Sequence, residues 1–286
     1  MRGGGFRTHK AHDPDTNGPP DNLPSRKQTQ ETQALVKPTP LIESALRGFK
    51  SKFEVLPAFS EELKDQVYRL RHHVYCEDLK WEPVHPSGKE TDDYDRHSVH
   101  VLLRYVPTGE NVGCVRMILT RPDDPTFRLP FERVCEGKLY PAALTFAGLH
   151  RDNVAEVSRL AVSSKFRRRQ GETDSAAPDI SQNFVLNDPK PRFPFILVGL
   201  YVGIVVMAKL RGIETLFVLT EPRLAQHFKR VGVTQVTQIG SPVEHRGMRI
   251  PSLMPVDGII DGFCMNPFVR PIYEAIYAQV SSARGG

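Results

Sequence analysis

Apolar residues first recur at regular three- and four-residue steps between about Ser60 and Asp78. This spacing predicts an amphipathic helix. Ser60 is a suitable N-cap, because its hydroxyl can accept a hydrogen bond from the first turn. The apolar face of the expected helix consists of Leu63, Val67, Leu70 and Val74.

Further along the chain the pattern changes from helical spacing to alternation. Residues 97–105 and 111–120 predict two strands joined by a turn at 107–110, an antiparallel hairpin. Ala155 to Val162 reads as a third strand, and Glu214 to Thr220 as a buried fourth one. Pro222 to Arg230 reads as a short helix.

The most apolar segment, Phe195 to Ala208, is shorter than the about 20 residues that a membrane span needs. It therefore predicts a buried core helix, with Gly212 as its C-cap and with Gly199 and Gly203 on one face where the sheet backbone could approach. Strands and helices alternate from Glu156 onward, which favours an α/β fold with a mixed central sheet flanked by helices. The chain ends in a further helical pattern, Ile272, Ile276 and Val280.

Composition fits one folded domain with a tail. The chain has 286 residues, of which 40% are hydrophobic, and a formal net charge of +5. We expect a disordered tail over 1–48, a domain over 49–286, and a polar loop or lid at 172–192. The modest positive charge favours an acidic partner, and no nucleic-acid-binding motif accompanies it.

The N-terminus has no hydrophobic stretch behind its basic start, so we expect no signal peptide and a cytoplasmic location. The four cysteines are widely scattered, which suits reduced thiols. His72, His73 and Cys76 could be imagined as metal ligands. A structural zinc needs four ligands, however, and no second cluster stands at a suitable spacing, so no metal site is predicted.

Charged residues gather where burial is costly. Glu90, Asp92 and Asp95 crowd one short segment, and like charges resist joint desolvation unless cations accompany them. The candidate cations lie in otherwise apolar runs: Arg71 on the first helix, and Arg116 and Arg159 within strands.

These residues stand in an order that resembles the N-acyl-homoserine-lactone (autoinducer) synthases and the related N-acyl amino acid synthases. The order is Arg71, Tyr75, Trp81, Glu90-x-Asp92-x-Tyr94-Asp95, Arg116 and Glu156-x-x-Arg159. Residues 221–224 and 240–249 look most like the acyltransferases associated with exosortase systems. The resemblance spans about Phe53 to Pro255. It implies a GNAT-like fold and transfer of an acyl chain from an acyl carrier protein or coenzyme A thioester to the amine of a small amino-acid-like acceptor.

The resemblance also suggests roles for individual side chains. Glu156, on the strand beside the expected thioester, is the candidate base, with Glu90 and Arg159 as further catalytic residues. A positioned carboxylate contributes about 10²–10⁴-fold as a general base. The candidate acceptor-binding residues are Arg71, Tyr75, Trp81, Asp92, Asp95 and Arg116. No Ser/His/Asp or Cys/His nucleophile arrangement is evident, so direct transfer is expected, with backbone N–H groups meeting the oxyanion.

Glu156 and Arg159 pose a geometric problem. Side chains alternate faces along a strand, so residues three apart point to opposite sides. Either the two serve different faces, or a β-bulge re-aims one of them. GNAT-type folds have a bulge beside the thioester, so the resemblance favours the bulge.

Donor binding is expected after this strand, at Val162 and in the run Arg168-Arg169-Gln170-Gly171. In GNAT enzymes such a loop offers backbone N–H groups to the coenzyme A pyrophosphate. Here Glu172-Thr173 replaces the second half of the motif, which makes an acyl carrier protein the better donor. No permanently bound cofactor is implied.

Two other functions fit the same residues. One is a homoserine-lactone synthase that uses S-adenosylmethionine, which the shared residues do not distinguish. The other is a catalytically silent GNAT-like module that binds an acidic carrier or an exosortase-linked partner. The full set of acids and arginines speaks against the silent module, because a binding module has no need of both charge signs.

Overall fold

A mixed β-sheet forms the centre of the computed structural model, which describes residues 40–124, 126–142, 150–167 and 195–283. Within these residues the sheet has eight strands in the order β1-β2-β3-β4-β5-β8-β6, with β7 paired to β8. β4 and β5 pair in parallel, whereas every other described pair is antiparallel. The predicted α/β fold with a mixed sheet is confirmed.

The strands are β1 (Phe53–Pro57), β2 (Ser98–Tyr105), β3 (Glu110–Leu119), β4 (Val154–Val162), β5 (Thr215–Thr220), β6 (Thr237–Gln238), β7 (Val243–Glu244) and β8 (Met248–Pro255). The helices are α1 (Pro40–Lys52), α2 (Glu61–His72), α3 (Pro130–Val134), α5 (Ser164–Arg167), α6 (Phe195–Leu210), α7 (Pro222–Arg230), α8 (Val256–Met265) and α9 (Arg270–Ala283). Three short elements complete the described part of the fold: the π-helix η1 (His73–Asp78) and the 3₁₀ helices η2 (Asp93–His97) and η3 (Arg151–Asn153).

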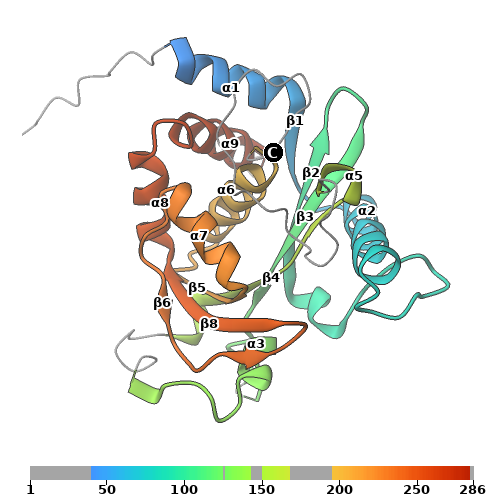
Figure 1. Cartoon of the computed structure of the whole chain (residues 1–286), viewed down its shortest axis with the longest axis vertical. Coiled ribbons are helices and arrows are strands. Elements are labelled where there is room, and N and C mark those ends of the chain that lie inside the picture. Colours follow the sequence, from blue (N-terminus) through green and yellow to red (C-terminus); the bar gives the residue numbers. More distant parts are fainter. Residues whose placement is uncertain (1–39, 125, 143–149, 168–194, 284–286) are drawn as a thin grey trace, which may run out of the picture. The chain divides into compact units, whose positions relative to one another are not determined.

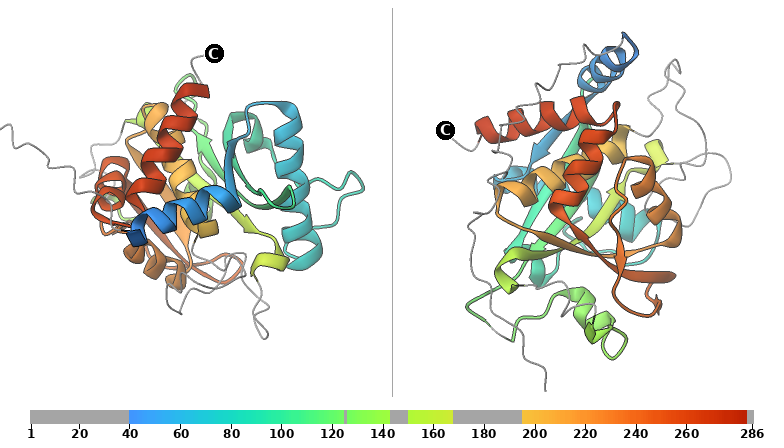
Figure 2. Two further views of the ribbon diagram at one scale, coloured as in Figure 1. Left: turned by 90° about the horizontal axis from the view of Figure 1, so that it is seen from above. Right: turned by 90° about the vertical axis from the view of Figure 1, so that its left-hand side faces the viewer.

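Helices cover both faces of the sheet (Figure 1). α2 packs on β2, β3 and β4, and α6 packs against β1, β2 and β3 on the opposite face, with α8 and α9 outside it. Figure 2 shows this layering from two further directions. The larger apolar core lies between the sheet and α6, α8 and α9, while a smaller core lies under α2.

α6 is apolar on every side because it is buried on every side. Thirteen of its residues are buried, between the sheet and the C-terminal helices. A Cβ on Gly203 would lie 2.8 Å from the side chains of Val55 and Val101, so glycine lets the helix sit close to the strands. The approach involves strand side chains rather than the strand backbone that the sequence suggested. The predicted C-cap is confirmed, since Gly212 has φ +72° just after the helix.

The predicted hairpin is confirmed by the pairing of β2 with β3. Two expectations change. The first described element, α1, begins at Pro40, so the expected tail boundary near residue 48 falls inside this helix, whose Phe49 is buried in the main core. The expected helix to Asp78 changes to a π-helix at His73. The remaining expected tail, to residue 39, and the expected lid at 172–192 lie outside the described residues.

The C-terminal helical pattern becomes α9, whose Ile272, Ile276 and Val280 are buried against the core that contains α6. Within the described segments, no helix combines the length and apolar character required to cross a membrane.

Candidate active site

The π-helix at the end of α2 places an aromatic pair at the site. Wider turns of this kind recur at functional positions. The carbonyl of Tyr75 accepts hydrogen bonds from the N–H groups of Trp81 (2.8 Å) and Glu82 (3.1 Å), which folds the chain back over η1. The rings of Tyr75 and Trp81 consequently stack, with centroids 5.9 Å apart.

The acid segment is held by a local capping box. The Asp92 carboxylate accepts the Tyr94 N–H at 3.0 Å, and the Asp95 carboxylate accepts the Asp92 N–H at 2.8 Å. These two hydrogen bonds start η2 and aim both carboxylates the same way. The spacing Asp-x-Tyr-Asp therefore brings the acids together before any distant residue contributes.

Arg71 is the most buried member of the charged cluster, with no exposed side-chain surface. Its Nε donates to Glu90, and its two terminal nitrogens donate to Asp95 at 2.7 and 3.2 Å. Burial alone would lower the pKa of this guanidinium, but the charges of Glu90 and Asp95 outweigh burial and raise it. The pKa of Asp95 falls to about 2, because Arg71 and Arg116 outweigh its own burial.

Arg116 continues the cluster from β3. It donates to Asp92 at 2.6 Å, to Asp95 at 2.9 Å and to the Ser158 hydroxyl at 3.2 Å. On the neighbouring strand His100 lies 3.7 Å from Asp95, and burial lowers its pKa to about 4, so the imidazole is neutral at pH 7. A charged arginine inside a strand is thus explained by two carboxylates that lie above the sheet.

β4 contains the bulge that the family resemblance favoured over the alternative of two opposite faces. The pairing of β3 with β4 slips between Cys114 and Arg116, and Arg159 adopts φ +52°. The carbonyl of Leu160, at the bulge, accepts a hydrogen bond from the Tyr75 hydroxyl at 2.9 Å. Bulges re-aim side chains beside active sites, and this one turns Arg159 toward the carboxylates over the α2 face.

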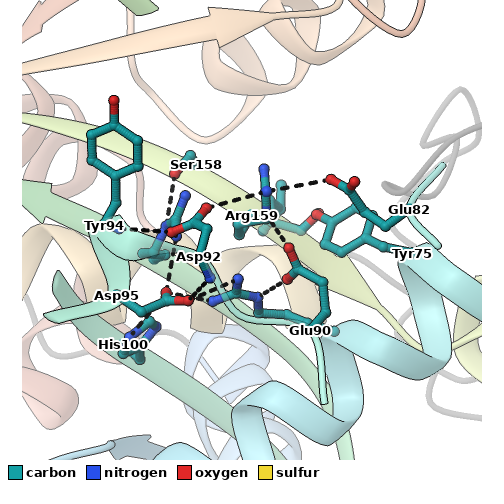
Figure 3. A network of polar contacts seen from close by, with 12 residues as sticks. Tyr75, Glu82, Glu90, Asp92, Tyr94, Asp95, His100, Ser158 and Arg159 are labelled. Carbon is teal, nitrogen blue, oxygen red and sulfur yellow. Dashed lines mark hydrogen bonds and ion pairs between the residues drawn. The ribbon is translucent and has the colours of Figure 1, made fainter. Parts of the chain in front are cut away.

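Arg159 links the acids to the cavity described below. It donates to Glu90 (3.1 Å), Asp92 (3.3 Å) and Glu82 (3.4 Å), and its guanidinium lies over the Tyr75 ring at 5.7 Å (Figure 3). The predicted convergence of Arg71, Asp92, Asp95, Arg116 and Arg159 into one network of ion pairs is confirmed.

A second set of cations comes from the turn between β7 and β8. Arg246, with φ +53°, pairs with Glu82. Arg249 pairs with Glu221 at 2.5 Å, and its guanidinium lies 6.0 Å from the centre of the Trp81 ring. In the sequence, Arg246 and Arg249 belong to the segment 240–249 that resembles the exosortase-associated acyltransferases, and no role was predicted for them. The signal was available, because Arg249 is a charge inside an apolar strand, as Arg116 is.

Glu156 lies apart from the ion-pair network. It is buried on β4, and its carboxyl accepts the Phe131 N–H at 2.9 Å. Burial raises its pKa to about 8, since the Phe131 hydrogen bond and the Arg116 charge only partly offset desolvation. A carboxyl with a pKa near the working pH can both accept and return a proton, which suits general acid–base chemistry.

A cavity of about 210 Å³ opens beside these groups. β4 and β5 are paired only as far as Val157 and Val218, and the residues just beyond that point line the cavity from both strands. The lining joins two kinds of surface. The polar part comprises Arg116, Glu156, Ser158, Arg159, Glu221, His245, Arg246 and Arg249, and the apolar part includes Tyr201, Ile204, Val205, Phe228, Ile259 and Phe263 beneath α6, α7 and α8.

The predicted site residues divide into two groups. Those that line the cavity are Tyr75, Trp81, Arg116, Glu156 and Arg159. Arg71, Glu90, Asp92 and Asp95 lie behind them and hold Arg116 and Arg159 in place. The catalytic role of Glu90 therefore stays a prediction, and its two arginine partners suit a bracing role. Val162 is buried in the main core and does not line the cavity, while Arg168, Arg169 and Gly171 lie outside the described residues.

Among the described residues, no three His, Cys, Asp or Glu side chains are grouped so that they could hold a metal ion. His72 and His73 both contact Glu77, at 3.0 and 2.9 Å, and Cys76 is buried in the small core under α2.

Comparisons with known proteins agree with this architecture. A family model described as an acetyltransferase (GNAT) domain matches residues 70–174. An acyl-homoserine-lactone synthase of Aeromonas hydrophila is 25% identical over 240 residues, which cover 82% of this chain and 96% of that protein. Two crystal structures share the fold with a TM-score of 0.51. TofI, in a ternary complex with an inhibitor and MTA, is 20% identical and aligned over 76% of this chain and 99% of its own. The AHL synthase LasI is 18% identical and aligned over 75% and 98%.

Proposed function

We propose that this chain, an acyltransferase of GNAT-like fold related to the acyl-homoserine-lactone synthases, transfers a fatty acyl chain from a thioester to the amine of an amino-acid-like acceptor. One observation carries the proposal. A single cavity joins a charged surface at β4 to an apolar interior beneath α6, at the point where β4 and β5 part. The apolar part suits a fatty acyl chain, and the charged part suits an ammonium and a carboxylate.

In this reaction the acceptor nitrogen attacks the thioester carbon, the C–N bond forms and the C–S bond breaks. Glu156 is the proposed catalytic base beside the thioester. With a pKa of about 8 it is mostly protonated at pH 7, so its minor ionised form takes a proton from the attacking nitrogen and returns it to the departing sulfur. Arg159 faces the same cavity and is fixed by Glu90 and Asp92, so it can orient a substrate carboxylate without moving. The backbone N–H groups of β4 beyond its last β5 partner, Val157, are the proposed donors to the oxyanion.

The proposed donor is an acyl carrier protein or coenzyme A thioester, with the carrier protein preferred because the motif at 168–173 lacks its second half. No permanently bound cofactor is part of the proposal. Residues 240–249 further suggest the exosortase-associated acyltransferases as the subgroup. Replacing both Arg168 and Arg169 by glutamate is expected to raise the KM for an acidic carrier protein. A donor KM that stays constant across a range of salt concentrations would contradict an electrostatic role of these two arginines.

The names of the relatives favour a second candidate, a homoserine-lactone synthase that uses S-adenosylmethionine. The charged residues that line the cavity favour an acceptor that lacks the additional positive charge of a sulfonium. An aromatic ring can bind a sulfonium through a cation–π contact. The ring of Tyr75, however, already contacts the Arg159 guanidinium, and the ring of Trp81 already contacts that of Arg249. Four arginines line the cavity against the carboxyls of Glu156 and Glu221, which disfavours a further positive charge.

To test the proposal, the purified protein is incubated with an acyl carrier protein or acyl-coenzyme A donor. Amino acids and S-adenosylmethionine are supplied as acceptors in parallel reactions. Mass spectrometry should detect an N-acyl amino acid whose formation falls strongly in a Glu156→Gln variant. An acyl-homoserine lactone formed only with S-adenosylmethionine would support the second candidate instead. Donor binding without any product would support a silent module.

A further inference from the structure

Forming an amide from an ammonium and a thioester requires the nitrogen to lose two protons. The first must leave before attack, because an ammonium has no lone pair. The second leaves as the C–N bond forms and ends on the sulfur of the released thiol. If Glu156 transfers the second proton, as proposed above, another group has to accept the first. That group then releases the first proton to solvent.

The other carboxylates are poorly placed to take it. Glu90, Asp92 and Asp95 do not line the cavity, and each is held in ion pairs with arginine. Glu221 lines the cavity but pairs with Arg249. A carboxylate whose oxygens are held by guanidinium groups has to give up those contacts before it can reach an ammonium in the cavity.

His245 is the remaining titratable group that reaches the cavity in the described part of the chain, apart from Tyr75 and Tyr201. Its half-buried side chain lines the wall together with Glu156 and Arg159. Across the described segments, no hydrogen bond or ion pair engages its ring, so neither ring nitrogen is committed to another side chain in this part of the chain.

The turn that carries His245 is firmly anchored. The His245 N–H donates to the Gly247 carbonyl at 2.9 Å, and the Gly247 N–H donates to the Glu244 carboxylate at 2.9 Å. Arg249 holds the Arg246 carbonyl at 2.8 Å. Arg246 and Gly247 both have positive φ, at 53° and 93°. This conformation is strained for a residue with a side chain such as Arg246, and strain of this kind is concentrated at functional sites. The turn therefore presents the imidazole at a defined position.

We propose that His245 is a catalytic residue that accepts the first proton from the acceptor ammonium, ahead of the attack assisted by Glu156. The charged groups that act on its ring are Arg246 from its own turn, Arg159 from β4 and Glu82 from the segment after η1. Burial, then the two arginines, lower the pKa of the imidazole, and Glu82 only partly opposes them. His245 is thus neutral at pH 7 and able to accept a proton.

This inference rests on the proposed function and is tested with two acceptors. One is an amino acid that the wild-type enzyme acylates. The other is its 2-aminooxy analogue, whose nitrogen is already unprotonated at neutral pH and needs no first deprotonation. The kcat/KM of each acceptor is measured between about pH 6 and pH 9 for the wild type, His245→Gln, Glu156→Gln and the exposed control His150→Gln.

At pH 7, His245→Gln should lower kcat/KM for the amino acid by about 10²-fold and leave the aminooxy acid close to its wild-type value. The deficit should shrink as the pH rises and free amine becomes available, and added imidazole should restore part of the rate. Glu156→Gln should impair both acceptors, and His150→Gln neither. An equal loss of both acceptors in His245→Gln, or no loss, would overturn the role of His245. A wild-type enzyme that acylates neither acceptor would instead overturn the proposed function, and this inference with it.

Discussion

Replacing Glu156 by glutamine should make the protein more stable at neutral pH and much less active. The carboxyl is buried, and its pKa is raised from an ordinary 4.5 to about 8, so ionisation in the folded state is costly. Glutamine has nearly the same shape and can accept the Phe131 N–H in the same way, yet it cannot ionise or transfer a proton. Stability and activity are therefore expected to move in opposite directions.

The magnitude follows from proton binding. Between pH 4.5 and about 8 the folded state holds one proton more than the unfolded state at this carboxyl, so the free energy of unfolding falls as the pH rises. The contribution is fully present below pH 4.5 and is lost as the pH rises through about 8. At pH 7 the loss of unfolding free energy corresponds to about 2.5 pH units at about 1.4 kcal/mol each, or about 3–4 kcal/mol. Glu156→Gln should recover at most this amount.

Urea unfolding of both proteins between about pH 5 and pH 9, with Glu61→Gln as an exposed control, measures the effect. The difference between variant and wild type should be small at pH 5 and grow to about 3–4 kcal/mol at pH 7, while turnover falls by about 10²–10⁴-fold. Parallel stability curves, or a variant less stable than the wild type at pH 7, would refute the assignment of a protonated, buried Glu156. Near-normal turnover would remove Glu156 from catalysis.

Arg71→Met should lower the free energy of unfolding by about 3–5 kcal/mol in urea titrations, because it removes one of the two arginine partners of each of the buried carboxylates Glu90 and Asp95; a loss below about 1 kcal/mol would contradict a buried network. Asp95 has a pKa depressed to about 2, so its stabilisation is present above about pH 4 and should be lost as the pH falls toward 2; Asp95→Asn should flatten this part of the acid-unfolding curve. Gly203→Ala should lower the free energy of unfolding by about 1–3 kcal/mol, since the added Cβ would lie 2.8 Å from two valine side chains. Gly48→Ala, with nothing within 4 Å of the added Cβ, should be neutral or slightly stabilising, and thermal melts of both variants measure the difference. Tyr201→Phe removes a buried hydroxyl that has no hydrogen-bond partner among the described residues, and it should raise the free energy of unfolding by about 1 kcal/mol; a destabilised variant would indicate that the hydroxyl is satisfied.

The sequence by itself determined most of the secondary structure and the charge cluster. Apolar spacing located α2, the β2–β3 hairpin and α6, because each element buries one face or, for α6, its whole surface. The acids and arginines were recognisable together because ions of one sign resist burial without the other. For Glu156 and Arg159, three apart on a strand, the sequence left open whether they face opposite sides or a bulge re-aims one; the family resemblance favoured the bulge, which the structure contains.

Only the tertiary structure decided which of these residues line the cavity. The sequence placed both Glu90 and Glu156 among the catalytic candidates. In the structure Glu90 is held between Arg71 and Arg159, whereas Glu156 reaches the cavity with a raised pKa. His245 reaches the same cavity although about 90 residues separate it from Glu156 along the chain, because β5, β8 and the turn before β8 complete the sheet beside β4. Local patterns report which side chains become buried, but pairing between distant strands determines which groups meet and hence their protonation.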